Sequence, residues 1–102
     1  MDELYARFLP QFVALARTRL ATALAAVAAE DRPAATAVVR ELHTLAGEAG
    51  LLGLARLVPL ARDCEVKAKL WQAGHPEASL DALTQALRAL AQMIEELAPA
   101  PT

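Results

Sequence analysis

Apolar residues recur at helical spacing along most of this chain, and residues that break helices separate the periodic stretches. Alanine and leucine dominate, and runs of β-branched residues, which favour strands, are almost absent. Between positions 35 and 52, a rotation of about 100° per residue gathers the apolar side chains on one face. These are Ala35, Val38, Leu42, Leu45, Ala49 and Leu52. The pattern predicts an all-α protein whose helices turn apolar stripes toward a common core.

The helix breakers in the N-terminal half divide it into three predicted helices. A short helix over about 2–9 should end at Pro10, because proline disfavours helical geometry in the residue before it. A second helix should run to about Ala29. In the turn "EDRPAA" we expect Asp31 to be the N-cap of the third helix, with Pro33 in its first turn.

The C-terminal half contains two more predicted helices. Gly53 should close the turn after the third helix. A fourth helix should occupy about Leu54 to Gln72, with Pro59 either kinking its first turns or delaying its start. The segment "AGHPEAS" is predicted to be a loop, after which Ser79 caps a last helix that ends near Leu97, just before a proline.

Composition is consistent with one small domain. The 102 residues are 56% hydrophobic, which is enough for a modest core. We therefore predict a single domain over 1–102, an antiparallel four-helix bundle with an additional short N-terminal helix and a frayed tail at 98–102. We expect it to be a monomer.

Charge and cysteine content narrow the possible partners and the compartment. The formal net charge is −2 and both signs are interspersed, so the basic stripe of a nucleic-acid binder is missing and we expect no nucleic-acid partner. Cys64 is the only cysteine, which excludes an internal disulfide and fits a reducing compartment. No secretion signal pattern or membrane-length apolar run is present, so we expect a cytoplasmic protein without a membrane partner.

The stretch "RELHTLAGEAGLLG" combines a lone histidine with glycines inside a strong helical pattern. His43 lies roughly 130° from the centre of the apolar stripe, so we expect it to point away from the core. Gly47 lies one helical turn further on, although an interior glycine costs about 1 kcal/mol relative to alanine. Bare backbone beside an exposed imidazole would let another protein approach closely. A solvated surface histidine with glycines near a helix end is the plain alternative.

The same stretch resembles a known family. "HTLAGEAGLLG", followed by "LARLVPLARDCE", resembles the histidine phosphotransfer (HPt) domain, whose pattern is a histidine, then leucine, lysine and two glycines at fixed distances. His43, Leu45, Gly47 and Gly53 occupy the matching places, and the flanking helices are also similar, so that the resemblance covers nearly the whole chain. The family's lysine, three residues after the histidine, is Ala46 here, at a position that we expect to be exposed.

The resemblance implies a phosphocarrier. His43 would take a phosphoryl group from a phosphorylated aspartate and pass it on, relaying it between receiver domains of response regulators or hybrid histidine kinases. Neutral imidazole, with an ordinary pKa of about 6.5, is a suitable nucleophile near neutral pH. No glycine-rich nucleotide loop is present, so we expect no ATP binding or hydrolysis and no cofactor. His43 and His75 lack acidic or thiol companions at ligand spacing, so we expect no metal site.

Charged residues near His43 are the candidate supporting groups. Arg40 lies one turn before it on the same side of the helix. On the fourth helix, Arg62, Glu65 and Lys69 share one flank that an antiparallel hairpin would bring alongside His43. Lys69 is our first candidate for a cation that replaces the missing lysine, and Lys67 on the opposite flank is the second. A solvated charged face is an equally good interpretation.

Apolar residues divide between core and docking candidates. Cys64 and Trp71 fall on the stripe of the fourth helix and are predicted to be core residues, as is Phe12. The resemblance also implies an apolar surface around the histidine, to which four residues of the N-terminal region are candidates: Phe8, Leu9, Phe12 and Val13.

Two other functions fit parts of the pattern. A non-catalytic HPt-like interaction module, which docks a receiver or kinase without carrying phosphate, would explain Ala46. A self-associating helical bundle would explain the alanine and leucine content but would leave Gly47 unexplained.

Overall fold

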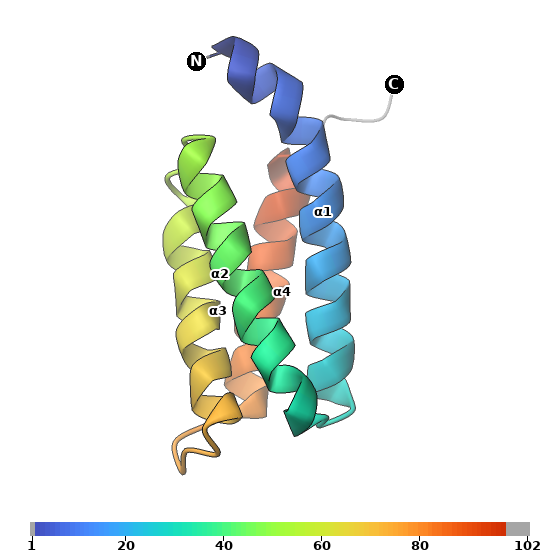
Figure 1. The fold of residues 1–102 in the computed structure, drawn as a ribbon, viewed down its shortest axis with the longest axis vertical. Helices are drawn as coiled ribbons and strands as arrows, with labels where there is room; N and C mark the ends of the chain where they lie inside the picture. Colours follow the sequence, from blue (N-terminus) through green and yellow to red (C-terminus); the bar gives the residue numbers. More distant parts are fainter. Residues whose placement is uncertain (1, 98–102) are drawn as a thin grey trace.

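Four α-helices make up the part of the chain that the structure describes. The computed structural model describes residues 2–97, apart from the side chains at positions 2 and 4. The helices are α1 (Asp2–Ala28), α2 (Ala35–Leu51), α3 (Leu57–Gln72) and α4 (Leu80–Leu97), and a single 3₁₀ turn, η1 (Arg32–Ala34), precedes α2. Each helix runs antiparallel to the next, α1 packs against α2 and α4, and α3 packs against α2 and α4 (Figure 1). The predicted all-α bundle is confirmed.

The core lies along the common axis of the four helices. Every helix contributes residues at the predicted apolar spacing, among them the stripe of α2, of which only Leu52 is partly exposed. The largest fully buried side chains are Leu42, Leu45, Leu57, Leu83, Leu87, Leu90, Ile94 and Cys64. Cys64 and Trp71 are core residues, as predicted, and burial raises the pKa of the Cys64 thiol to about 12, so it stays protonated and unreactive.

The predicted break at Pro10 is wrong. Pro10 lies inside α1, which continues without interruption from Asp2 to Ala28, so a separate N-terminal helix is absent from the described residues. Proline removes only one backbone donor, and the carbonyl thus left free belongs to Ala6, which is exposed and can bind water. Figure 1 shows the first turns bent away from the axis of the rest of α1, as expected of a proline inside a helix.

Three of the helices end in the same motif. After α1, Asp31 N–H donates to the Ala26 carbonyl at 3.0 Å, and the equivalent bonds after α2 and α3 are Leu54 to Ala49 at 2.9 Å and His75 to Leu70 at 2.9 Å. This Schellman arrangement needs one residue in left-handed conformation. Those residues are Glu30 (φ 52°), Gly53 (φ 74°) and Gly74 (φ 65°). The predicted role of Gly53 is confirmed, whereas Glu30 occupies a position that favours glycine.

The helix starts agree only in part with the sequence. Asp31 makes no side-chain capping bond, and the turn η1, which contains Pro33, separates it from α2. The predicted cap is therefore wrong, because the 3₁₀ turn takes up the orphan donors: Ala34 N–H donates to the Asp31 carbonyl at 3.0 Å. Pro59 delays α3 to Leu57, so that proline stands in its first turn, where no donor is needed. Ser79 caps α4 as predicted, accepting from Ala82 N–H at 3.1 Å.

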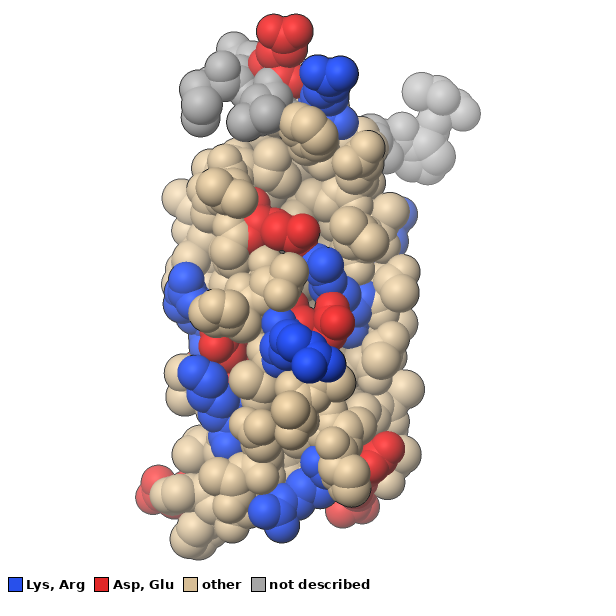
Figure 2. All heavy atoms as spheres, viewed as in Figure 1, with Lys and Arg blue, Asp and Glu red and all other residues tan. Residues whose placement is uncertain are grey.

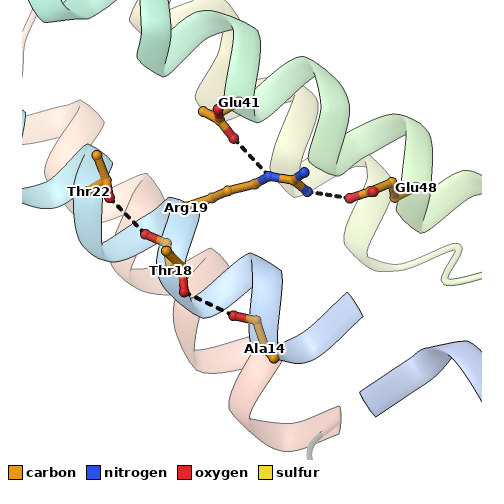
Figure 3. Close-up of polar contacts among 6 residues, drawn as sticks. All are labelled: Ala14, Thr18, Arg19, Thr22, Glu41 and Glu48. Atoms are coloured by element: carbon orange, nitrogen blue, oxygen red, sulfur yellow. Dashed lines mark hydrogen bonds and ion pairs between the residues drawn. The ribbon is translucent and has the colours of Figure 1, made fainter. Parts of the chain in front are cut away.

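A charged cluster joins α1 to α2. The half-buried Arg19 guanidinium donates to Glu41 at 2.8 Å and to Glu48, two helical turns apart on α2 (Figure 3). One planar guanidinium thus fixes the register of the two helices.

Two further predictions concern membrane-spanning helices and the C-terminal tail. Within residues 2–97, no helix is long and apolar enough to cross a membrane. The predicted frayed tail at 98–102 lies outside the described residues.

Candidate functional site

His43 lies in the middle of α2 and points outward. Its side chain is 68% exposed, whereas the nearby Leu42 and Leu45 of the same helix are buried in the core. The predicted orientation is therefore confirmed. The periodicity of the helix alone produces it, since the apolar stripe that faces the core lies on the other side of α2.

Glu65 of α3 lies directly against the imidazole. Its Oε2 is 3.0 Å from His43 Nδ1, and its side chain is only 7% exposed. No other charged residue of the described chain is buried. Because a carboxylate can only accept, Nδ1 is the protonated nitrogen in this contact, and Nε2 is left without a partner among the described residues. The sequence placed Glu65 on the flank facing His43 but assigned it no role.

Two basic side chains of α3 complete the contacts of this carboxylate. Lys69 Nζ lies 3.3 Å from Oε2, the oxygen that binds the imidazole, and Arg62 Nη1 lies 3.6 Å from Oε1. Both are more than half exposed, so their charges stand at the rim of the site. The predicted group of Arg62, Glu65 and Lys69 is thus brought together beside His43.

The ionisation of Glu65 reflects two opposing effects. Burial by itself raises the pKa of the carboxyl group, but the hydrogen bonds and charges of His43 and Lys69 outweigh it and hold the pKa below its ordinary value. Glu65 is therefore an anion at neutral pH, buried beside an exposed imidazole.

The remaining candidate cations lie apart from this carboxylate. Arg40 is exposed one turn before His43, and it forms no ion pair within residues 2–97. Lys67 is bound to Asp63 at 2.7 Å along α3, so the second candidate for a replacement cation is engaged elsewhere. Figure 2 shows basic side chains in the middle and along the α3 edge of the face that α2 presents.

Gly47 and Gly50 leave α2 bare next to His43. A Cβ placed on either would meet nothing within 4 Å, and both residues are exposed in regular helix. They follow His43 by four and seven residues, so they share its side of the helix. The predicted open backbone beside the histidine is confirmed.

Ala46 differs from its prediction. We expected an exposed site, but the residue is 1% exposed and belongs to the core. It lies between His43 and the apolar stripe, on the side of α2 from which Glu65 reaches the imidazole. The closeness of α3 there covers it, so position 46 cannot present a side chain to a partner as it stands.

An apolar hollow lies beyond the glycines at the C-terminal end of α2. It measures about 350 Å³ and is lined by Phe8, Gln11, Phe12, Leu15, Glu48, Leu51 and Leu52. Of the four predicted docking residues, Phe12 and Val13 are buried in the core and Leu9 is partly buried, so only Phe8 offers a substantial exposed surface. Leu15 and Leu51, which the sequence did not single out, are more exposed than Phe8.

The second histidine lies apart from His43, and the described residues contain no potential metal site. His75 lies in the loop after α3, where its Nδ1 accepts from Glu77 N–H at 3.0 Å. Over residues 2–97 no three side chains of histidine, cysteine, aspartate or glutamate form a potential metal site.

Comparison with known proteins identifies one matching family. The family model of the Hpt domain matches residues 7–100, which is nearly the whole chain and includes both helices of the site. No curated protein matches the chain. No solved structure matches it either.

Proposed function

The chain belongs to the Hpt domain family, whose members are phosphocarrier modules of two-component signalling, and we propose that it relays a phosphoryl group between aspartates of receiver domains through His43. The observation that carries the proposal is the largely exposed imidazole whose Nδ1 is bound to Glu65 while Nε2 has no partner among the described residues. A docked receiver domain would find a free nitrogen lone pair there. Receivers of response regulators or of hybrid histidine kinases are the proposed partners.

The other site residues support this role in different ways. Gly47 lets the backbone of the receiver come close to the imidazole, because nothing projects from α2 at that point. Lys69 is the proposed replacement for the family's lysine, since its ammonium group stands at the rim beside the imidazole and can neutralise phosphoryl charge. Arg40, which is on α2, provides a second exposed cation in addition to Lys69 of α3. Ala46 contributes no charge and, being buried, no contact.

The docking surface is proposed to continue along α2 toward its C-terminal end. From His43 the bare stretch of Gly47 and Gly50 leads to Leu51, which is 81% exposed and borders the apolar hollow. Exposed apolar surface next to a reactive side chain is typical of protein contact sites. The chain needs no nucleotide for this reaction, so we propose that it acts without ATP.

The proposal is tested by phosphotransfer from a panel of phosphorylated receiver domains. We expect the chain to acquire a label that is stable in alkali and labile in acid, as a P–N bond requires. His43→Gln should abolish the label, whereas His75→Gln, the matched control, should not. Helix content and thermal stability of His43→Gln should stay nearly unchanged, because the side chain is largely exposed.

Two results would contradict the proposal. Labelling that survives in His43→Gln, or that moves to His75, would exclude His43 as the acceptor. Stable binding of a receiver without any transfer, with every donor tried, would favour the non-catalytic interaction module.

A further inference from the structure

Arg40 is an exposed cation that adjoins His43 and has no acidic partner within residues 2–97. It precedes the histidine by one turn of α2, so that the two side chains are neighbours on the surface of the helix. The cations that the adjacent helices present to α2 are in a different state. Arg19 of α1 is paired with two carboxylates of α2, and Lys69 of α3 is paired with Glu65. Arg40 therefore holds its positive charge uncompensated beside the imidazole.

The two flanks of His43 differ in what they face. With a rotation of about 100° per residue, Arg40 is turned about 60° from His43 toward the flank where Glu48 binds α1. Ala46 is turned by a similar angle in the opposite direction, where it is buried. Glu65 reaches the imidazole from that second flank. Arg40 and Glu65 therefore lie on opposite sides of the histidine.

The ring nitrogens are directed to these two sides. Glu65 Oε2 lies 3.0 Å from Nδ1 of His43, which turns that edge of the imidazole toward α3. Nε2 lies on the opposite edge of the ring, points away from Glu65, and has no partner among the described residues. A phosphoryl group bound to Nε2 would extend from this edge. The long side chain of Arg40, one turn away on the same flank, can reach its oxygens.

We propose that Arg40 binds the phosphoryl group carried by His43 and shifts the exchange equilibrium toward the phosphorylated chain. This inference rests on the proposed function. A guanidinium can donate to two phosphoryl oxygens at once, which an ammonium cannot match in geometry. Only the phosphorylated form offers these oxygens. The contact therefore stabilises that form and leaves the free imidazole unaffected.

Arg40 acts in the exchange as a fixed charge. The Nε2 lone pair attacks the phosphorus of an aspartyl phosphate, the P–O bond to the aspartate breaks, and the aspartate carboxylate leaves with the electron pair. Arg40 takes up and releases no proton, because a guanidinium stays charged in proteins. Lys69 is less suited to hold the transferred group, because its ammonium lies 3.3 Å from Glu65 Oε2 and shares its charge with that carboxylate.

The phosphoryl group itself reports the contact without any partner. The chain is phosphorylated with phosphoramidate, and ³¹P NMR follows the second ionisation of the phosphoryl group as pH changes. We expect Arg40→Gln to raise the pKa of this ionisation by about half a pH unit, because the dianion loses its cation at an exposed site. Arg40→Lys, which keeps the charge, should retain most of the wild-type value. Added salt should reduce the difference between Arg40→Gln and the wild type.

Arg88→Gln is the matched control for the loss of charge. Arg88 is exposed on α4, which packs against α1 and α3, so the variant removes the same charge from the chain but far from His43. It should leave the pKa of the phosphoryl group unchanged, and Lys69→Gln should change that pKa less than Arg40→Gln does. A wild-type pKa in Arg40→Gln, or an equal change in Arg88→Gln, would overturn the inference.

An exchange experiment then measures the equilibrium. A phosphorylated receiver is mixed with the chain, and the ratio of phosphorylated chain to phosphorylated receiver is read when it no longer changes. We expect this ratio to fall by about two- to fivefold in Arg40→Gln and to stay at the wild-type value in Arg88→Gln. Because the ratio is an equilibrium quantity, a slower encounter with the receiver does not alter it. An unchanged ratio in Arg40→Gln would contradict the proposed shift.

The two proposals can fail separately. If no receiver exchanges phosphate with His43 but the pKa of the chemically attached phosphoryl group responds to Arg40→Gln, the proposed relay is wrong and the phosphoryl contact of Arg40 stands. If transfer through His43 occurs but neither the pKa nor the exchange ratio responds to position 40, the relay stands and the inference on Arg40 is wrong.

Discussion

Gly47 offers the sharpest test of the site, because stability and activity should respond to it in opposite directions. Gly47→Ala places a methyl group in open space within a regular helix, since an added Cβ meets nothing within 4 Å. The gain is then the difference in helix propensity, about 1 kcal/mol, part of which comes from a less flexible unfolded chain. For a domain of this size the melting temperature should rise by about 4–8 °C. Urea denaturation and calorimetry measure both quantities.

A large side chain at the same position should block the partner. Gly47→Leu and Gly47→Arg begin from a Cβ that meets nothing within 4 Å on an exposed helix surface, so we expect them to fold at least as well as the wild type, but they place bulk about 6 Å along the helix from His43. We expect phosphotransfer from a receiver to fall at least tenfold. Phosphorylation by phosphoramidate, a small donor, should be unaffected.

Gly50 is the matched control for these variants. It is exposed on the same side of α2, an added Cβ there also meets nothing within 4 Å, and it lies about 10 Å along the helix from His43. Gly50→Ala should therefore stabilise by the same amount, whereas Gly50→Leu should reduce transfer less than Gly47→Leu does. If a large residue at 47 left receiver transfer intact, the explanation by close approach would be wrong.

Three further predictions concern packing, turns and pH. Ala46→Lys should lower the free energy of unfolding by roughly 1–3 kcal/mol in urea denaturation, because the site is buried, whereas exposed Ala14→Lys should change it little. Glu30→Gly should raise the free energy of unfolding by about 1 kcal/mol, and Gly53→Ala, which meets no steric obstacle, should lower it by a similar amount. The lowered pKa of Glu65 stabilises the fold above the pKa of the unfolded chain, and this contribution is lost as pH falls through the folded value. The pH dependence of stability in acid should therefore be flatter in Glu65→Gln.

Much of the fold could be predicted because apolar periodicity and glycine positions are local signals. The stripe of α2 determined both the core face and the outward direction of His43, and Gly53 marked the end of that helix. The break predicted at Pro10 is wrong because the preference of a single residue takes no account of the packing of the residues that follow it. Phe12 and Val13 are buried just after the proline, and their packing holds α1 together through the lost hydrogen bond.

Only those features of the candidate site that depend on the spacing within a single helix could be predicted. Helical spacing placed Arg62, Glu65 and Lys69 on one flank, but no pattern within α3 says that Glu65 is buried and bound to Nδ1. That depends on the distance between α2 and α3, which is a tertiary property. The predicted exposure of Ala46 is wrong for the same reason, since the flank of α2 that is free in an isolated helix is covered in the bundle.

The missing lysine and the buried carboxylate follow from one packing arrangement. Small residues on both helices, including Ala46 on α2 and Ala61 and Ala68 on α3, are fully buried, and small buried side chains allow two helices to approach closely. Only with α3 this close can the short reach of a glutamate bring Oε2 to 3.0 Å from the imidazole. A lysine at position 46 would have to pass its stem between the helices to reach solvent, which would push α3 and Glu65 away from His43. Arg62 and Lys69 of α3 flank the carboxylate that binds the imidazole, whereas position 46 of α2, where the family has its lysine, is covered in this fold and holds a small core residue.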